Sequence, residues 1–120
     1  MSEWLVDSRQ RVHRIIEALA QDAEGQLQYL RSLGFQPGSE VVDELALELD
    51  EVPQRLDGLV AAGLLTDTQA ERIQTFCTDI GGLQGIWDRD DLDKPAWTQV
   101  RFAAAELLRE IDGLPDASTS

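Results

Sequence analysis

The chain has 120 residues, and 23 acidic side chains against 10 basic ones give a formal net charge of −13. That charge argues against a face that neutralises the phosphates of DNA, RNA or an anionic membrane, and it favours a basic protein partner. With one cysteine, Cys77, and one histidine, His13, we expect no disulfide, no metal and no cofactor. The N-terminal residues contain no apolar segment of the signal-peptide kind, so we expect a cytoplasmic protein.

The first predicted helix runs from Asp7 or Ser8, either of which is suited to cap it, to Leu33, with Gly34 as its stop. Apolar residues recur in this segment at steps of three and four, as on one buried helix face. They are Val12, Ile15, Ile16, Leu19, Ala23, Leu27 and Leu30. Gly25 lies inside the pattern, and glycine weakens a helix by about 1 kcal/mol relative to alanine. We therefore expect one helix, in which Gly25 is a place where a bend could form.

The second predicted helix runs from Ser39, its expected cap, to Ala62, with Gly63 as its stop. Its apolar positions alternate steps of three and four residues, which is the seam of a helical bundle. The seam residues are Val42, Leu45, Leu49, Val52, Leu56 and Leu59. Pro53 interrupts the segment because proline lacks a backbone donor and clashes with the preceding turn. We expect a kink at Pro53, or two helices nearly end to end.

Two further helices are predicted in the C-terminal half. One follows a cap at Thr66 or Asp67 and ends at Gly81–Gly82, and the other covers Pro95–Ile111. No segment alternates apolar and polar residues, so we predict an all-α fold, an antiparallel bundle of four to five helices. Residues 1–113 form a single domain in this prediction, and 114–120 form a flexible tail. The residues expected to be buried are Leu45, Leu49, Val52, Leu56, Ile73, Phe76, Val100 and Leu107.

The segment before the last helix, residues 87–97, is rich in acidic residues. A calcium loop of the EF-hand type needs a glycine at its sixth place and a glutamate at its twelfth, but counting from Asp88 these places hold Asp93 and Gln99. We therefore expect no tight metal site. We expect Asp93 to cap the last helix, since acids near a helix N-terminus meet the positive end of its dipole. The sequence leaves open whether the segment also contacts a partner.

No motif for nucleophilic catalysis or phosphate binding is present. The glycines between Gly81 and Gly85 follow a helix rather than a strand and lack the lysine–serine pair of a P-loop. A Cys77–His13 pair is conceivable, but Cys77 lies on the apolar face of its helix, where cysteine usually acts as a small buried hydrophobe. His13 lies between two arginines on a helix flank. We therefore expect a protein that is not an enzyme.

An acidic stripe follows the second helix on the side opposite its apolar seam, with Leu47 in its midst. An apolar residue inside a charged rim is typical of protein interfaces, where the rim speeds encounter and the centre holds the partner. The predicted partner-binding residues are Glu40, Asp43, Glu44, Leu47, Glu48, Asp50 and Glu51. The alternative is that Leu47 covers another helix, which would leave the stripe only half exposed.

Three functions stay open. In size, acidity and helical character only, the chain resembles immunity proteins and antitoxins that neutralise basic nuclease toxins, which implies non-enzymatic inhibition of a basic protein. Glu48-x-x-Glu51 resembles half of the magnesium site of helical nucleotide pyrophosphohydrolases, but the second pair, glutamate-x-x-aspartate, has no counterpart on a helix. The third function is that of a structural or regulatory homodimer. The basic flank of Arg9, Arg11 and Arg14 could then pair with an acidic helix of the same chain or of a second copy.

Overall fold

The computed structural model describes residues 3–112, and every regular element in that range is helical, so the predicted all-α class is confirmed. The elements are α1 (Glu3–Ala20), α2 (Ala23–Ser32), α3 (Asp43–Glu51), α4 (Pro53–Ala61), α5 (Asp67–Gly81), the 3₁₀ helix η1 (Arg89–Asp93) and α6 (Pro95–Ile111). The predicted domain boundary at residue 113 and the predicted tail lie outside the described residues. None of the helices in residues 3–112 combines the length and the apolar character that crossing a bilayer requires.

The first predicted helix is two helices in the structure. α1 ends at Ala20, and α2 begins after Asp22, whose carboxylate accepts a hydrogen bond of 2.8 Å from the backbone N–H of Gly25. The prediction of one continuous helix is therefore wrong, because the chain breaks at Asp22, which caps a new helix. Gly25 is instead a point of close packing: a Cβ atom there would lie 2.9 Å from the Cβ of Gln21.

α1 also begins earlier than predicted, at Glu3. Ser8 is buried inside the helix, and its hydroxyl accepts a hydrogen bond of 2.8 Å from the Arg55 guanidinium. Asp7 pairs with Arg11 one turn further on, at 2.7 Å. Neither residue caps the helix, because both already have helical neighbours on their N-terminal side.

The structure divides the second predicted helix at Val52 into α3 and α4. Pro53 lies in the first turn of α4, where its missing N–H leaves no helical hydrogen bond unmade. The seam residues are buried through both helices. The kink at Pro53 stays a prediction. The cap predicted at Ser39 is wrong, since the residue before α3 is Val42, whereas Gly63 follows α4 with a φ of 76°, as the predicted stop requires.

α5 and α6 have the predicted bounds. The Thr66 hydroxyl accepts a hydrogen bond of 3.0 Å from the N–H of Gln69, and the Gln69 side chain accepts one of 2.9 Å from the N–H of Thr66. This reciprocal pair is a capping box. The cap predicted at Asp93 is wrong: Asp93 ends η1, and the residue before α6 is Lys94, which makes no side-chain capping bond. Pro95 begins α6 and has no N–H that would need a cap.

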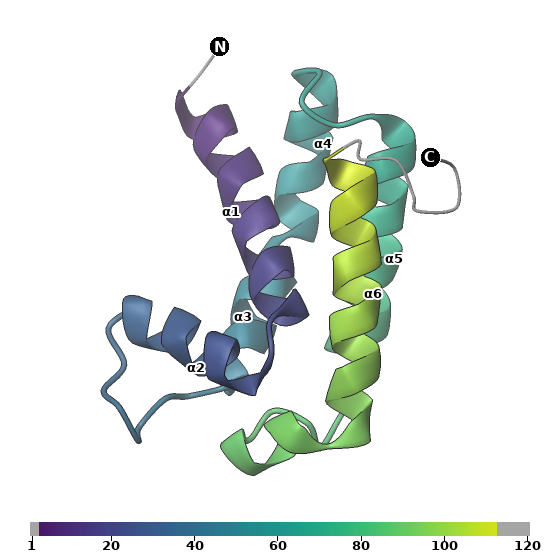
Figure 1. Cartoon of the computed structure of the whole chain (residues 1–120). Helices are drawn as coiled ribbons and strands as arrows, with labels where there is room; N and C mark the ends of the chain where they lie inside the picture. The colour runs from purple at the N-terminus through teal and green to yellow at the C-terminus, as the bar shows by residue number, and fades with distance from the viewer. Residues whose placement is uncertain (1–2, 113–120) are drawn as a thin grey trace.

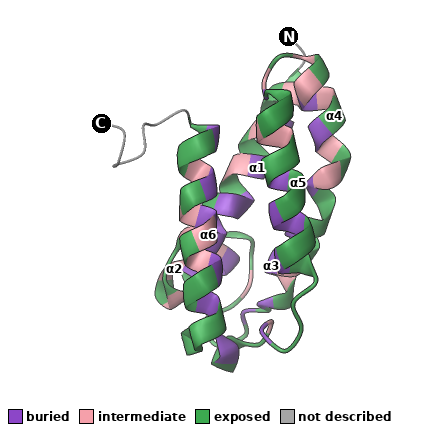
Figure 2. Cartoon of the chain, turned by 90° about the vertical axis from the view of Figure 1, so that its right-hand side faces the viewer, coloured by how far each residue is buried: buried purple, intermediate pink, exposed green. Residues whose placement is uncertain are grey.

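The core lies where the helices face one another. α1 packs along α6, α3 and α4 pack on both α1 and α5, and α5 also packs on α6 (Figure 1). Figure 2 shows the buried faces turned inward and the exposed faces turned outward. The residues that the sequence predicts to be buried are all buried: Leu45, Leu49, Val52, Leu56, Ile73, Phe76, Val100 and Leu107. The antiparallel order of the bundle stays a prediction.

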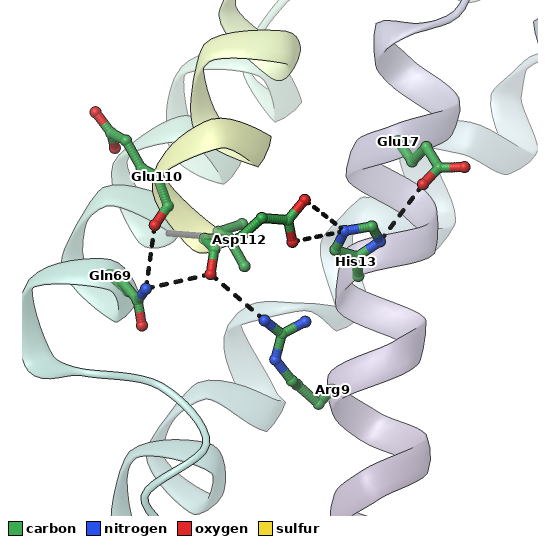
Figure 3. A network of polar contacts seen from close by, with 7 residues as sticks. Arg9, His13, Glu17, Gln69, Glu110 and Asp112 are labelled. Atoms are coloured by element: carbon green, nitrogen blue, oxygen red, sulfur yellow. Dashed lines mark hydrogen bonds and ion pairs between the residues drawn. The ribbon is translucent and has the colours of Figure 1, made fainter. Parts of the chain in front are cut away.

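Side chains of α1 and α5 hold the C-terminal end of α6 (Figure 3). The Gln69 amide donates hydrogen bonds to the carbonyl oxygens of Glu110, at 3.1 Å, and Ile111, at 3.3 Å. The Arg9 guanidinium donates to the carbonyl of Ile111 at 3.5 Å. The last carbonyls of a helix have no partner within it, so these two side chains act as its cap and tie three helices together.

The residues of the conceivable Cys77–His13 pair have separate surroundings. His13 is on α1, where its Nε2 lies 2.9 Å from the Asp112 carboxylate and its Nδ1 lies 3.6 Å from Glu17 (Figure 3). Cys77 is buried in α5, and burial, with a smaller contribution from the charge of Asp50, raises the pKa of its thiol to about 12. A thiol with such a pKa stays protonated at neutral pH and is a poor nucleophile.

Candidate functional site

A cleft of about 330 Å³ opens between α1, α2 and α3. The short helix α2, which forms one wall, projects outward at the lower left of Figure 1, on the side of α1 away from α6. The cleft contains four of the predicted partner-binding residues: Glu44, Leu47, Glu48 and Glu51. We call it the α3 cleft. Its other lining residues are Arg11, Val12, Arg14, Ile15, Tyr29, Leu33, Val52 and Arg55.

One face of α3 forms the acidic wall. Leu47, Glu48 and Glu51 lie three, four and seven positions after Glu44, so the four residues share one side of the helix. Leu47 is 56% exposed, whereas Leu49, on the opposite side, is 0% exposed. Glu51 is exposed, but Glu44 and Glu48 are half-buried. The structure therefore places Leu47 outside the core, and its role as an anchor stays a prediction.

Glu48 is the carboxylate most affected by the cleft. It accepts a hydrogen bond from the Tyr29 hydroxyl on α2. Burial raises the pKa of Glu48, and the charges of Glu44 and Glu51 raise it further, while the bond from Tyr29 acts in the opposite direction. Burial also raises the pKa of the Tyr29 phenol, and its bond to Glu48 adds to that shift. The anion of Glu48 is therefore held in a place where a nearby positive charge would stabilise it.

A basic wall faces these carboxylates. Arg11 and Arg14 come from α1, and Arg55 comes from α4. Arg14 lies near enough to lower the pKa of both Glu48 and Tyr29. The structure thus brings two residues of the basic flank, Arg11 and Arg14, opposite the acidic stripe of the same chain, which is one of the two arrangements that the sequence left open, whereas Arg9 lies at the end of α6. The cleft consequently has one acidic and one basic side.

Leu33 is a lining residue that the sequence analysis missed. It follows the last turn of α2, is 41% exposed, and lines the same cleft as Leu47. Two exposed leucines in one cleft make a larger apolar centre than one. The signal that could have found Leu33 is the cap at Asp22, because only a separate α2 turns the end of that helix toward α3.

Glu40 is not on the exposed stripe, and this part of the prediction is wrong. Glu40 precedes α3 and is only 4% exposed. Its carboxylate accepts hydrogen bonds from Arg31, at 2.6 Å, and from the backbone N–H of Gly38, at 2.9 Å, and it lies 3.5 Å from Arg89. Its own backbone amide and the Arg31 guanidinium hold the pKa of Glu40 below its usual range, although burial acts against them. Glu40 does not belong to the acidic stripe because it lies before α3, which begins at Asp43 and not at Ser39.

Asp43 and Asp50 lie on other sides of α3. Asp43 lines a separate hollow between the start of α3 and the segment before α6, together with Val41 and Trp87. Asp50 faces α5, where its charge acts on Cys77. The α3 cleft therefore gathers four of the predicted partner-binding residues and leaves these two outside it.

The acidic segment before α6 forms a compact turn. Asp91 is buried, and its carboxylate lies 2.5 Å from Lys94 and accepts a hydrogen bond of 3.2 Å from the N–H of Asp88. Lys94 holds the pKa of Asp91 below its usual range. Trp87 packs edge-on against Trp97, with ring centroids 5.5 Å apart and planes at 89°. At least one acid of this segment thus stabilises the turn rather than facing a ligand.

In residues 3–112, no three side chains of the His, Cys, Asp or Glu type are arranged to hold a metal ion. No protein-family model, no curated protein and no solved structure matches this chain. The function must therefore be argued from the chemistry of the α3 cleft.

Proposed function

We propose that the protein binds a basic protein partner through the α3 cleft, with Leu47 as its apolar anchor. The observation that carries this proposal is an exposed leucine surrounded by the carboxylates of Glu44, Glu48 and Glu51 at the mouth of a cleft. Negative charge around an apolar centre, in a chain of net charge −13, speeds the encounter with a basic protein. The apolar centre then slows its dissociation.

The partner class that we propose is a basic toxin, and the mode of action is occlusion. Carboxylates of the cleft would pair with the arginines and lysines that such a toxin uses to hold phosphate. The resemblance to immunity proteins and antitoxins supports this proposal in size, acidity and helical character. A cytoplasmic location, an antiparallel bundle and a kink at Pro53 belong to the same proposal.

The contact residues that we propose differ from those predicted from the sequence. Glu40 is left out as a direct contact because its carboxylate is buried and already bonded. Asp43 and Asp50 are outside the cleft, so they contribute to the long-range field and not to the contact. Leu33 is added because it lines the cleft and is exposed.

Site-specific photo-cross-linking in the cell that makes the protein tests the proposal. A cross-linking amino acid replaces Leu47 in one variant and Leu83 in a control, since Leu83 is 38% exposed and lies outside the cleft. We expect one basic protein to be captured from position 47 and not from position 83. Capture of an acidic protein, or equal capture from both positions, would contradict the proposal.

Association kinetics with the captured protein provide the second arm of the test. The double variant Glu44→Lys, Glu48→Lys should associate more slowly and with less dependence on salt, because it removes an attraction that salt screens at separations beyond about 8 Å at physiological ionic strength. Leu47→Ala should instead dissociate faster at an unchanged association rate, because it removes apolar contact without changing the charge. A partner whose kinetics respond to neither change does not bind at the α3 cleft.

One observation favours the alternative of a magnesium-dependent nucleotide pyrophosphohydrolase. Glu48 and Glu51 line a cleft that also holds Arg14 and Arg55, so carboxylates for a metal and arginines for phosphates lie together. Against it, the part of the chain that the structure describes contains no metal-binding group of three side chains. Its test is the release of pyrophosphate from nucleoside triphosphates with magnesium. Release that Glu48→Gln abolishes would favour this alternative over the binding protein.

A further inference from the structure

The α3 cleft has walls of opposite charge and an apolar floor. Glu44 and Glu51 mark the wall on α3, and Arg11 and Arg14 mark the wall on α1. The floor consists of buried aliphatic side chains, namely Val12, Ile15 and Val52. A segment bound there would contact acidic groups on one side, basic groups on the other, and apolar groups beneath. A uniformly basic segment meets only one of these walls favourably.

The walls also restrict the backbone conformation of a bound segment. α1, α2 and α3 satisfy most of their backbone N–H and C=O groups internally, so they offer no edge with which an extended segment could pair. An extended segment would lose hydrogen bonds to water without replacement, whereas a helix brings its own. A cavity of about 150 Å³ holds a benzene-sized group, so the cleft, at about 330 Å³, has room for two apolar side chains of about that size.

We propose that the partner segment in the α3 cleft is an amphipathic helix with an apolar stripe on the cleft floor, a basic flank against α3 and an acidic flank against α1. This inference rests on the proposed function and adds the chemistry of the bound segment. The apolar stripe lies between Leu33 and Leu47, which border the floor. The basic flank contacts Glu44, Glu48 and Glu51. The acidic flank contacts Arg11 and Arg14.

Two synthetic helical peptides with one leucine stripe test the inference. The mixed peptide carries lysines along one flank of the stripe and glutamates along the other, and the all-lysine peptide carries lysines along both. A mixed peptide with its lysine and glutamate flanks exchanged would not serve as a control. It could bind in the reverse direction, and each flank would then face the wall of opposite charge again. Fluorescence anisotropy of labelled peptides gives the dissociation constants at about 0.3 M salt, where the net charge of the protein is screened.

We expect the mixed peptide to bind about threefold to fivefold more tightly than the all-lysine peptide, because the contact with Arg14 changes from repulsive to attractive, while Asp7 already offsets much of the charge of Arg11. Arg14→Glu should reduce or reverse the preference for the mixed peptide over the all-lysine peptide. Arg109→Glu is the matched control: Arg109 is exposed on α6 outside the cleft, so the same charge change should leave the preference intact.

The outcomes separate this inference from the proposed function. If the all-lysine peptide binds more tightly and Leu47→Asp weakens its binding, the mixed-flank helix is wrong and the basic partner stands. If Leu47→Asp weakens neither peptide, the cleft is not the docking site and both are wrong. If neither peptide binds at concentrations up to about 1 mM, the inference is overturned.

Discussion

The Tyr29 hydroxyl on α2 donates a hydrogen bond to the Glu48 carboxylate on α3, inside the α3 cleft. This bond joins two helices that are separated in sequence by a turn-rich segment, residues 33–42. It also holds Glu48 where burial and the neighbouring Glu44 and Glu51 raise its pKa. A half-buried anion of this kind lowers the stability of the free protein at neutral pH, and a cation from a partner would relieve that cost.

Glu48→Gln should stabilise the protein at neutral pH. A raised pKa means that the folded state binds more protons than the unfolded state between the two pKa values, so stability falls as pH rises through that window. Glutamine stays neutral and can still accept the hydrogen bond from Tyr29. Urea unfolding should show the variant more stable at about pH 7 and equal to the wild type at about pH 3, below the ordinary pKa of a glutamate. A variant that is less stable at pH 7 would show that the charge of Glu48 supports the fold.

Leu49→Ala and Leu47→Ala form a matched pair on one helix. Leu49 is buried in the seam, so its truncation should cost about 2–5 kcal/mol of unfolding free energy. Leu47 is exposed, so its truncation should change stability by less than about 0.5 kcal/mol. Denaturant unfolding measures both. A loss of several kcal/mol for Leu47→Ala would place Leu47 in the core and remove the proposed anchor.

Glu40→Gln should destabilise the fold without altering peptide binding in the cleft. The substitution removes the negative charge that Arg31 and Arg89 face. Because the pKa of Glu40 is lowered, its stabilising effect is present above the ordinary glutamate pKa and is lost as pH falls through the lowered value. The difference in unfolding free energy between wild type and variant should therefore shrink in acid. Weaker peptide binding by a variant of unchanged stability would show that Glu40 contacts the partner.

Leu33→Asp should weaken binding of the mixed peptide as Leu47→Asp does, because both leucines border the apolar floor. Phe102→Asp is the control, since Phe102 is 66% exposed on α6 and outside the cleft. Both changes introduce one carboxylate at an exposed apolar position, so a general effect of charge would appear equally in the two. Peptide binding that responds to Phe102 and not to Leu33 would move the docking surface to α6.

Local patterns predicted much of the fold. The three- and four-residue steps of the seam identified the buried side of α3 and α4. The cap at Thr66 and the proline at Pro95 marked the starts of α5 and α6, although the cap predicted at Asp93 is wrong. The break before α2 was missed because the apolar spacing continues through Leu27 and Leu30, which hides the capping signal of Asp22.

The candidate site was predicted only in part, because it depends on residues distant in sequence. The α3 face with Leu47 follows from periodicity within one helix. Glu40 is buried by Arg31 and Arg89, which come from α2 and η1. Likewise, the placement of Arg14 opposite Glu48 depends on how α1 packs beside α3, and no local spacing encodes that packing.

The central claim is that the α3 cleft is where a basic partner docks, and nuclear magnetic resonance of the ¹⁵N-labelled protein tests it most directly. The all-lysine peptide is titrated into the protein at about 0.3 M salt, so that diffuse attraction to the acidic surface is screened. Chemical-shift changes should concentrate on the backbone amides around Leu33, Leu47 and Glu48. Changes spread evenly over the acidic surface, or centred on Phe102, would contradict it.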